Sequence, residues 1–393
     1  MTMYHHDARS YQTAASEAIE HFKKNLQTGI QRAAGGMRQL QERVISDTLQ
    51  PLSDLKYTLD GRALRVNGNA ITGAALTQLC AQTKLLKPGY CKDLLSHSSP
   101  LAQELAIDTL ETLSALRTDQ MTMLRSVDGV IRGAVTDAYK RMDSRLIVGT
   151  FADVIREGKL CPVQCELSET KIYVRALMPR IYGEEFGEAL AFGLELRASD
   201  FGFGNVELLP FVDRVWCTNK AYLTLPIGKG FKKAHRGARL TEETFALSAR
   251  TQELQIEAMA SEMRDGISGI LSEDAIKAYS SCIARCFAEQ RSLGSKFDAI
   301  KELDKLVTAR KLSEKQAKYI GEAYASPDRS VVPAEPGRWK LAQAIAYAAQ
   351  HMNHITDHVD ATNKAFDVTA DLEWLAGEVV AAAPAGAILA ASN

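Results

Sequence analysis

The sequence has no long apolar run and no excess of charge of one sign. No stretch approaches the ~18 consecutive apolar residues that a membrane-spanning helix needs, and proline and glycine interrupt the alanine-rich tail at 381–393. Across 393 residues, 47 Lys and Arg stand against 48 Asp and Glu, which gives a formal net charge of −1. Because bulk charge then provides no steering, affinity for a polyanion has to come from a local patch. We expect no membrane partner.

Cysteine is sparse, with seven residues, an odd number. The chain is long and no signal-peptide pattern opens it, so we expect reduced thiols in a cytoplasmic protein. Two Cys-x-x-x-Cys pairs, at 161/165 and 282/286, fall within the loose spacing of zinc ligands. The second pair lies on an expected helix, where this spacing simply marks one buried face. We interpret the cysteines as small core residues.

Catalytic signatures are missing as well. The sequence contains no Gly-x-x-x-x-Gly-Lys-Ser/Thr loop, no His-Glu-x-x-His and no Gly-x-Ser-x-Gly. One cluster has the composition of a metal site: His351, His354 and His358 share a face if this stretch is helical. Adjacent turns of one straight helix rarely offer three nitrogens at tetrahedral angles, so we favour a polar face. We expect no enzyme, no cofactor and no metal.

Tight-turn signals divide the first part of the chain into hairpins. Asp60-Gly61 and Asp128-Gly129 each stand between alternating apolar positions, the strongest short hairpin signal. A third pair of strands is expected at 161–167 and 171–178, and the glycine-containing turn at 200–205 joins two more.

Helices are expected around these strands. Residues 1–50 have a helical pattern that Gly35-Gly36 breaks in two. The segment after Asp143 has an apolar face at helical spacing, and Ser313 with Gln316 forms a capping box in the helical region after Leu240. The sequence therefore predicts an α+β fold: a central, mostly antiparallel sheet of hairpins and a meander with a covering helix, flanked by a long helical C-terminal region. The expected divisions are an N-terminal helical arm (1–50), an α+β core with a basic loop (51–239) and a helical C-terminal region (240–393).

One stretch departs from the balanced charge of the chain. From Arg214 to Arg239 there are seven cations and no Asp or Glu. Such a patch attracts a polyanion, of which nucleic-acid phosphate is the usual one; a solvated loop after a strand is the alternative. The side chains expected to contact nucleic acid in this basic loop are Lys220, Lys229, Phe231, Lys232, Lys233, Arg236 and Arg239.

A second cationic surface is expected on the sheet itself. Lys171, Tyr173 and Arg175 alternate along one strand and share a face, and Arg197 lies on the next strand. Cations for the backbone and a ring for a base are what a single-stranded nucleic acid requires. The alternative is an exposed face of ordinary strand residues, because Tyr is a good strand former.

Four segments between Asp47 and Val380 carry a family resemblance: VNGNAITGAALTQLCAQTKLLKPGYCKDLL, IRGAVTDAYKRMD, VELLPFVDRVWCTN and WKLAQAIAYAAQHMNHITDH. They are similar to a family of bacteriophage and plasmid proteins catalogued as domain of unknown function nine-three-two. Lys220 stands where that family usually has glycine after Cys-Thr-Asn, and 344–346 reads Ala-Ile-Ala where Asn-Ala is typical. The resemblance implies a shared fold and a bacterial host, and it implies no activity, because the family has none established.

The expected outline is also similar to annealing proteins of the RecT/Redβ type, which form rings or filaments with DNA in a basic groove. This resemblance implies a homo-oligomer that binds single-stranded nucleic acid, DNA in preference, in strand annealing or recombination. Two alternatives stay open. One is a structural or regulatory phage protein whose basic loop contacts a protein partner, and the other is a metal-dependent nucleic-acid hydrolase that uses the His351 cluster.

Overall fold

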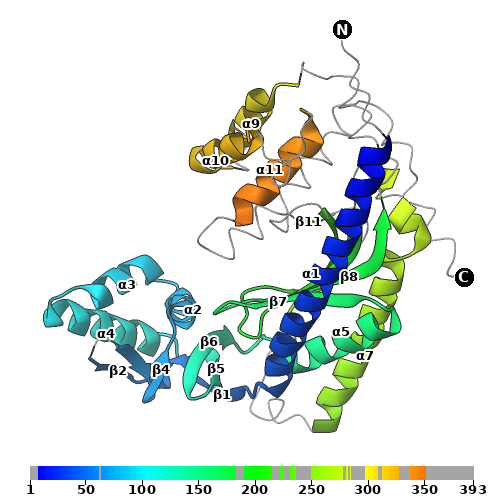
Figure 1. Ribbon diagram of the computed structural model, residues 1–393. Helices are drawn as coiled ribbons and strands as arrows, with labels where there is room; N and C mark the ends of the chain where they lie inside the picture. The colour runs from blue at the N-terminus through cyan, green and yellow to red at the C-terminus, as the bar shows by residue number, and fades with distance from the viewer. Residues whose placement is uncertain are drawn as a thin grey trace, which may run out of the picture.

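The computed structural model describes residues 8–61, 63–182, 190–214, 222–224, 231–235, 249–277, 280–281, 284, 297–308, 312–326 and 336–350. Over these ranges the chain is a mixed α+β fold with a helical C-terminal region, which confirms the predicted fold class (Figure 1). The strands do not form one central sheet, however. They divide into two six-stranded sheets.

The first sheet is built by the N-terminal strands in the order β1-β5-β6-β4-β3-β2, with one parallel pair, β4 with β6. Its strands are β1 (Ser46–Pro51), β2 (Tyr57–Asp60), β3 (Ala63–Val66), β4 (Asn69–Ile71), β5 (Met121–Val127) and β6 (Val130–Thr136). The two Asp-Gly hairpins are confirmed, between β2 and β3 and between β5 and β6. Asp128 and Gly129 have φ of 52° and 74°, the left-handed backbone that a type I′ turn requires.

Three helices cover one face of this sheet: α2 (Gly73–Thr83), α3 (Pro88–Ser96) and α4 (Pro100–Ala115). Thr72 caps α2, because its side chain accepts a hydrogen bond from the Ala75 amide at 3.3 Å. Leu79 and Leu110 pack in the same buried cluster as Leu124 of β5. A short 3₁₀ turn, η1 (Leu52–Asp54), links β1 to β2.

The second sheet is antiparallel, in the order β11-β10-β9-β8-β7, and β12 also pairs with β10. Its strands are β7 (Cys161–Leu167), β8 (Ile172–Tyr182), β9 (Leu190–Ala198), β10 (Val206–Arg214), β11 (Tyr222–Thr224) and β12 (Phe231–Lys233). The expected covering helix is α5 (Ser144–Glu157), and α7 (Ala249–Ile270) joins it. Phe151 and Met263 of these helices pack against Val174 and Leu196 of the sheet.

The C-terminal helices pack at one end of the same sheet (Figure 1). They are α9 (Ala299–Thr308), α10 (Glu314–Tyr324) and α11 (Arg338–Gln350). Trp339 and Ile345 of α11 share a buried cluster with Phe192 and Val212 of the strands. The capping box at the start of α10, between Ser313 and its third helical residue, is confirmed.

The N-terminal helix α1 is not broken at its glycine pair. It runs without interruption over Ala8–Glu42, so the predicted break at Gly35-Gly36 is wrong. A Cβ added at Gly36 would lie 2.9 Å from the Cys165 side chain, and one at Gly29 would lie 2.8 Å from the Val163 carbonyl oxygen. These two glycines allow α1 to approach β7 closely, so they serve packing in place of a turn.

A buried ion cluster joins the two sheets. Arg125 of β5 has no exposed side-chain surface, and its guanidinium donates to Asp47 at 2.8 Å and to Asp143 at 2.5 Å. It also donates to the backbone carbonyl of Asp200, in the turn between β9 and β10, at 2.5 Å. Burial opposes the charge, but Asp143 and Asp47 hold the pKa of Arg125 above its usual value.

Asp200 extends this cluster to the covering helix. Its carboxylate accepts hydrogen bonds from the Ser144 amide at 2.6 Å and the Ser144 hydroxyl at 2.7 Å, and it pairs with Arg43 at 3.2 Å. Asp143, expected to cap α5, makes no capping hydrogen bond with its side chain. Asp200 therefore caps α5 from a distant part of the chain, while Asp143 is engaged by Arg125.

Candidate nucleic-acid interface

The register of the second sheet brings the predicted strand residues together on one face. One row of cross-strand neighbours runs over five strands: Glu166, Tyr173, Arg197, Glu207 and Lys232. The adjacent row on that face contains Gln164, Arg175 and Glu195. In these two rows three cations, Arg175, Arg197 and Lys232, meet three carboxylates, so the charges of the two rows cancel.

Arg175 and Tyr173 are buried, each with 2% of its surface exposed. Arg175 and Arg197 both donate through Nε to the carboxylate of Glu195, and Arg175 also donates to Gln164 at 2.8 Å. The expectation of an exposed cationic face at these positions is corrected. Glu195 supplies a counter-charge from the neighbouring strand, and an ion pair of this geometry withstands burial.

The charges around Glu195 also fix its ionisation. Burial alone would raise the pKa of the carboxyl, but Arg175 and Arg197 outweigh burial and lower it from 4.5 to about 2. Glu195 is therefore charged at neutral pH.

Part of the basic loop forms β12, at the edge of β10. Lys232 is 66% exposed at its side chain and pairs with Glu207 at 2.7 Å, and Lys233 pairs with Glu262 of α7 at 2.6 Å. The sequence window has no acidic residue, but the fold supplies carboxylates from two other elements. Phe231 begins β12 opposite Leu208.

The other predicted residues divide into two groups. Lys171 lies half-buried at the β7–β8 turn, where its carbonyl accepts from the Ser168 amide. Lys220, Lys229, Arg236 and Arg239 lie outside the described residues, as does the cluster of His351, His354 and His358.

One described residue of the basic loop, His235, is anchored to the rest of the fold. His235 follows β12, and its ring stacks on Tyr139 with centroids 4.9 Å apart. Its backbone carbonyl accepts from the Lys140 amide at 3.2 Å. Burial lowers the pKa of His235 to about 4, so the ring is neutral at physiological pH. The position of β12 is thereby tied to the Arg125 cluster, since Arg125 also contacts Tyr139.

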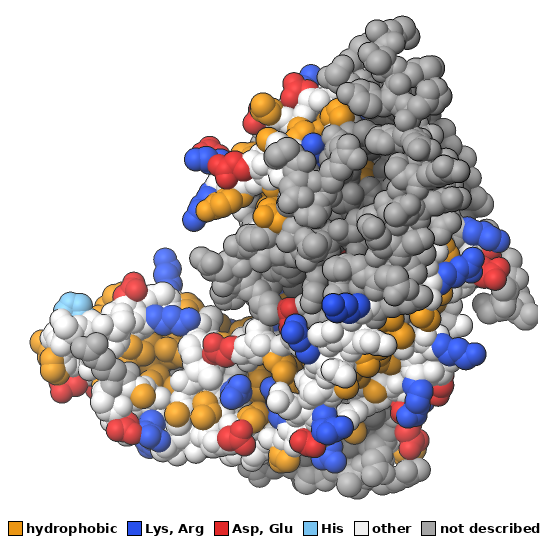
Figure 2. Space-filling model, in the orientation of Figure 1, with side chains coloured by type: hydrophobic (Ala, Val, Ile, Leu, Met, Phe, Trp, Pro, Cys, Tyr) orange, Lys and Arg blue, Asp and Glu red, His pale blue; other side chains and the backbone are white. Residues whose placement is uncertain are grey.

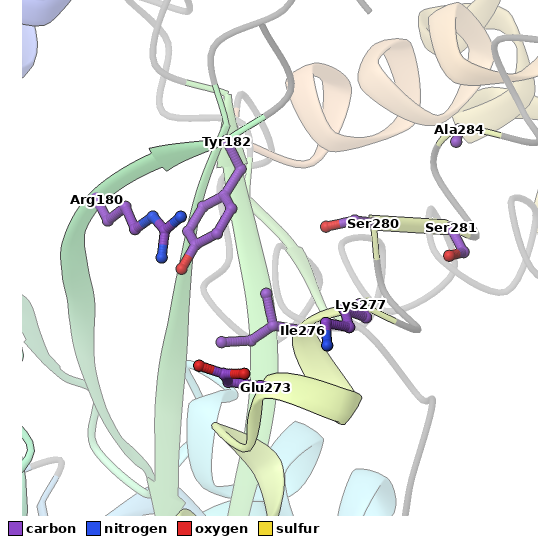
Figure 3. A pocket seen from close by; sticks show the side chains of 8 residues that line it. All are labelled: Arg180, Tyr182, Glu273, Ile276, Lys277, Ser280, Ser281 and Ala284. Carbon is purple, nitrogen blue, oxygen red and sulfur yellow. The ribbon is translucent and has the colours of Figure 1, made fainter. Parts of the chain in front are cut away.

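An open cavity of about 420 Å³ lies where β8 meets the segment after α7 (Figure 3). The Arg180 guanidinium lies over the Tyr182 ring, 4.9 Å from its centroid, and Phe192 holds that ring in an edge-to-face contact at 5.0 Å. Lys277 stands across from them (Figure 3). The lining is completed by Glu273, Ile276, Ser280, Ser281 and Ala284.

The cavity brings cations and an aromatic ring together. This is the combination that the sequence predicted for another place, the sheet face of Tyr173 and Arg175, which is buried. Sequence reasoning missed Arg180 and Tyr182, because the predicted strand ended at Met178, whereas β8 continues to Tyr182. Alternation would not have placed Tyr182 beside Tyr173 and Arg175 either, because Tyr182 pairs with Leu190 and lies on the opposite face of the strand, in the buried cluster of Met178. On the face in Figure 2, the described Lys and Arg side chains are interspersed with Asp and Glu, which makes a local cavity the more distinctive feature.

Within the described ranges, no group of three His, Cys, Asp or Glu side chains is placed to hold a metal ion. No described helix is both long and apolar enough to cross a membrane. The chain matches no family model, and no curated protein or solved structure matches it significantly. The resemblance to the phage and plasmid family stays a prediction.

Proposed function

We propose that this protein binds single-stranded DNA as a homo-oligomer and acts in strand annealing or recombination. The observation that carries the proposal is the stacking of Arg180 on Tyr182 in the wall of an open cavity. Proteins that bind single strands combine cations along the backbone with rings on which bases stack. A chain of net charge −1 needs such a local site, because its overall field does not attract DNA.

The cavity suits one nucleotide unit of a strand. Its volume of about 420 Å³ is in the usual range of ligand pockets. Arg180 and Lys277 project from different elements, so each can take a different phosphate oxygen (Figure 3). Phe192 holds the Tyr182 ring in place, and a ring that is already ordered loses little entropy on binding.

The charge at the cavity also fits a strand in preference to a protein surface. A planar guanidinium stacks on bases as well as on protein rings and donates to phosphate in a fork. Ser280 and Ser281 add hydroxyls that donate to phosphate or sugar oxygens. An acidic protein partner would use the cations but would leave the aromatic ring without a role.

The test is the affinity for a labelled 20-nucleotide oligo-dT, measured by fluorescence anisotropy at moderate salt. Lys277→Ala removes one phosphate contact and Tyr182→Ala removes the stacking ring, so both are expected to weaken binding. The expected loss for the tyrosine is about 5- to 150-fold, the range for one stacked base. Thermal melting checks that each variant is folded, since Tyr182 packs against the core.

The matched controls are Lys318→Ala and Tyr319→Ala on the exposed side of α10, remote in sequence from the cavity lining. Tyr319 is 54% exposed, so its removal tests for a general loss of surface rings. Equal losses in control and cavity variants would refute the cavity as the site. Failure of the wild-type protein to bind DNA at low salt would refute the function and leave a protein partner for this surface.

A further inference from the structure

Glu273 is out of place in a cavity that only binds phosphate. It lines the same cavity as Arg180, Tyr182 and Lys277, and its carboxylate lies across from the Tyr182 ring (Figure 3). A carboxylate beside a phosphate backbone repels it, and this repulsion lowers affinity unless the carboxylate gains hydrogen bonds from the ligand.

The cations of the cavity do not engage Glu273. Its i,i+4 spacing from Lys277 would suit a helical ion pair. In the described part of the chain, however, no ion pair within 4.0 Å forms between them, and Glu273 accepts no side-chain hydrogen bond. The carboxylate is exposed and therefore available to a ligand.

The bases of DNA differ in what they offer a carboxylate. Guanine presents two adjacent donors on its Watson–Crick edge, N1–H and the N2 amino group, which match the two carboxylate oxygens. Adenine and cytosine present one amino donor beside an acceptor nitrogen, and thymine presents one N–H between two carbonyls. Two parallel hydrogen bonds to a charged acceptor are stronger and more specific than one. Guanine is therefore the base that a carboxylate beside a stacking ring selects.

We infer that the cavity takes a guanine base of the single strand, with the ring stacked against the Arg180–Tyr182 pair and its Watson–Crick edge donating to Glu273. The inference rests on the proposed function, because it assigns a base preference to the same cavity. Lys277 and Arg180 then hold the flanking phosphates, and Glu273 is the residue that determines specificity.

The test compares two labelled 20-nucleotide strands, oligo-dT and the same strand with one central guanine. The wild-type protein is expected to bind the guanine-containing strand about five- to tenfold more tightly, the lower part of the range for one bidentate contact. Glu273→Gln is expected to reduce this ratio to less than twofold. The ratio is the readout because removal of a negative charge alone raises affinity for both strands equally.

Asp274→Asn is the matched control. Asp274 is the next residue, it is exposed, and it lies in the same first helical turn after Ser272, but it does not line the cavity. It therefore reproduces the change in charge and in helix-end electrostatics without touching the base. The guanine preference is expected to persist in this variant.

The outcomes separate the inference from the proposed function. Tight binding of both strands with no difference between them refutes the guanine inference and leaves single-strand binding intact, as does a preference that survives Glu273→Gln. No binding of either strand refutes both.

Competition with free dGMP and dTMP tests whether the cavity takes its guanine from a strand or from a free nucleotide. Displacement by millimolar dGMP without any strand preference would identify a free nucleotide as the ligand and would overturn a site for the strand.

Discussion

At the scale of single residues, the joint between the two sheets depends on Arg125. Its guanidinium holds Asp47, Asp143 and the carbonyl of Asp200 in a position closed to water. Removal of one partner from a buried ion pair leaves uncompensated charge, which typically costs about 3–5 kcal/mol. Arg125→Met is therefore expected to lower the free energy of unfolding by that amount in urea denaturation.

Arg145→Met is the control for this prediction. Arg145 is exposed on α5, close in sequence to Asp143, and its replacement is expected to change stability by less than about 0.5 kcal/mol. Similar losses in the two variants would mean that the buried cluster has no special role.

Glu195 gives a pH dependence whose sign follows from its environment. Its pKa is lowered from 4.5 to about 2 in the folded protein, after Arg175 and Arg197 outweigh burial. The unfolded chain therefore binds the proton first, so the stabilisation is fully present above about pH 4.5 and is lost as pH falls toward 2. Urea denaturation at intervals from pH 6 to pH 2.5 is expected to show this loss.

In the Glu195→Gln variant, the free energy of unfolding is expected to fall less steeply with decreasing pH, by up to the slope that one bound proton contributes. The variant itself is expected to be less stable. Glu314→Gln, on the exposed first turn of α10, is expected to leave the slope unchanged. A wild-type slope in the Glu195 variant would contradict the account of the Arg175–Glu195–Arg197 group.

The same residues show what sequence can and cannot predict about a site. Alternation correctly placed Tyr173 and Arg175 on one face, and Arg197 beside them. It did not reveal that Glu195 and Glu207 face these cations, because the pairing of distant strands depends on register. Alternation within one strand is a local property, whereas the charge of a face is the sum over several strands.

At the scale of elements, two glycines of α1 allow the effect of helix propensity on stability to be compared with the effect of packing. Gly35 has open space around its Cβ position, whereas a Cβ at Gly29 would meet the Val163 carbonyl oxygen at 2.8 Å. Gly35→Ala is expected to stabilise the protein by about 0.5–1 kcal/mol, because alanine is the better helix former. Gly29→Ala is expected to destabilise it by about 1–3 kcal/mol, because backbone has to move.

Thermal or urea denaturation of the two variants checks this pair of predictions. Both variants replace glycine with alanine, so a difference between their free energies of unfolding reports the contact of α1 with β7. If both alanines stabilise the protein, α1 does not dock on β7 through its glycine face.

Turn chemistry predicted the hairpins well because it is local. Both Asp-Gly turns are present, and so is an unpredicted third tight turn at Asn67-Gly68, with φ of 50° and 80°. Asn-Gly favours this turn for the same reason as Asp-Gly, because both residues adopt positive φ readily. Pro88 is the first residue of helix α3, a position that favours proline because the amide it lacks would have no partner within the helix.

At the scale of the whole molecule, the sequence predicted one central sheet, whereas the strands form two separate sheets. The first sheet needs β1 beside β5 and a parallel pair between β4 and β6. Neither contact follows from a hairpin, so composition and periodicity favour one continuous meander. Long-range pairing of this kind is set by the packing of the whole chain, and no local signal indicates it.

Assembly is the first prediction at this scale. One cavity per chain makes only a few phosphate contacts, and a site of that size has a non-specific Kd of about 10⁻⁴ to 10⁻⁶ M at physiological salt. Repetition of the site around a ring or filament raises the effective concentration without new contacts. We therefore expect an oligomer larger than a dimer, alone or with single-stranded DNA, in light scattering. A strict monomer with DNA present would remove the support for annealing.

The most direct test of the central claim is the salt dependence of single-strand binding. Release of counterions makes log K fall linearly with log salt, by about 0.7 for each phosphate contact on a single strand. For the wild-type protein we predict a steep fall between 50 and 200 mM salt, and for Arg180→Ala/Lys277→Ala a slope smaller by about 1.4 per subunit, since two contacts are lost. Binding that does not change with salt, or the same slope in the double variant, would contradict a role of this cavity in holding the strand.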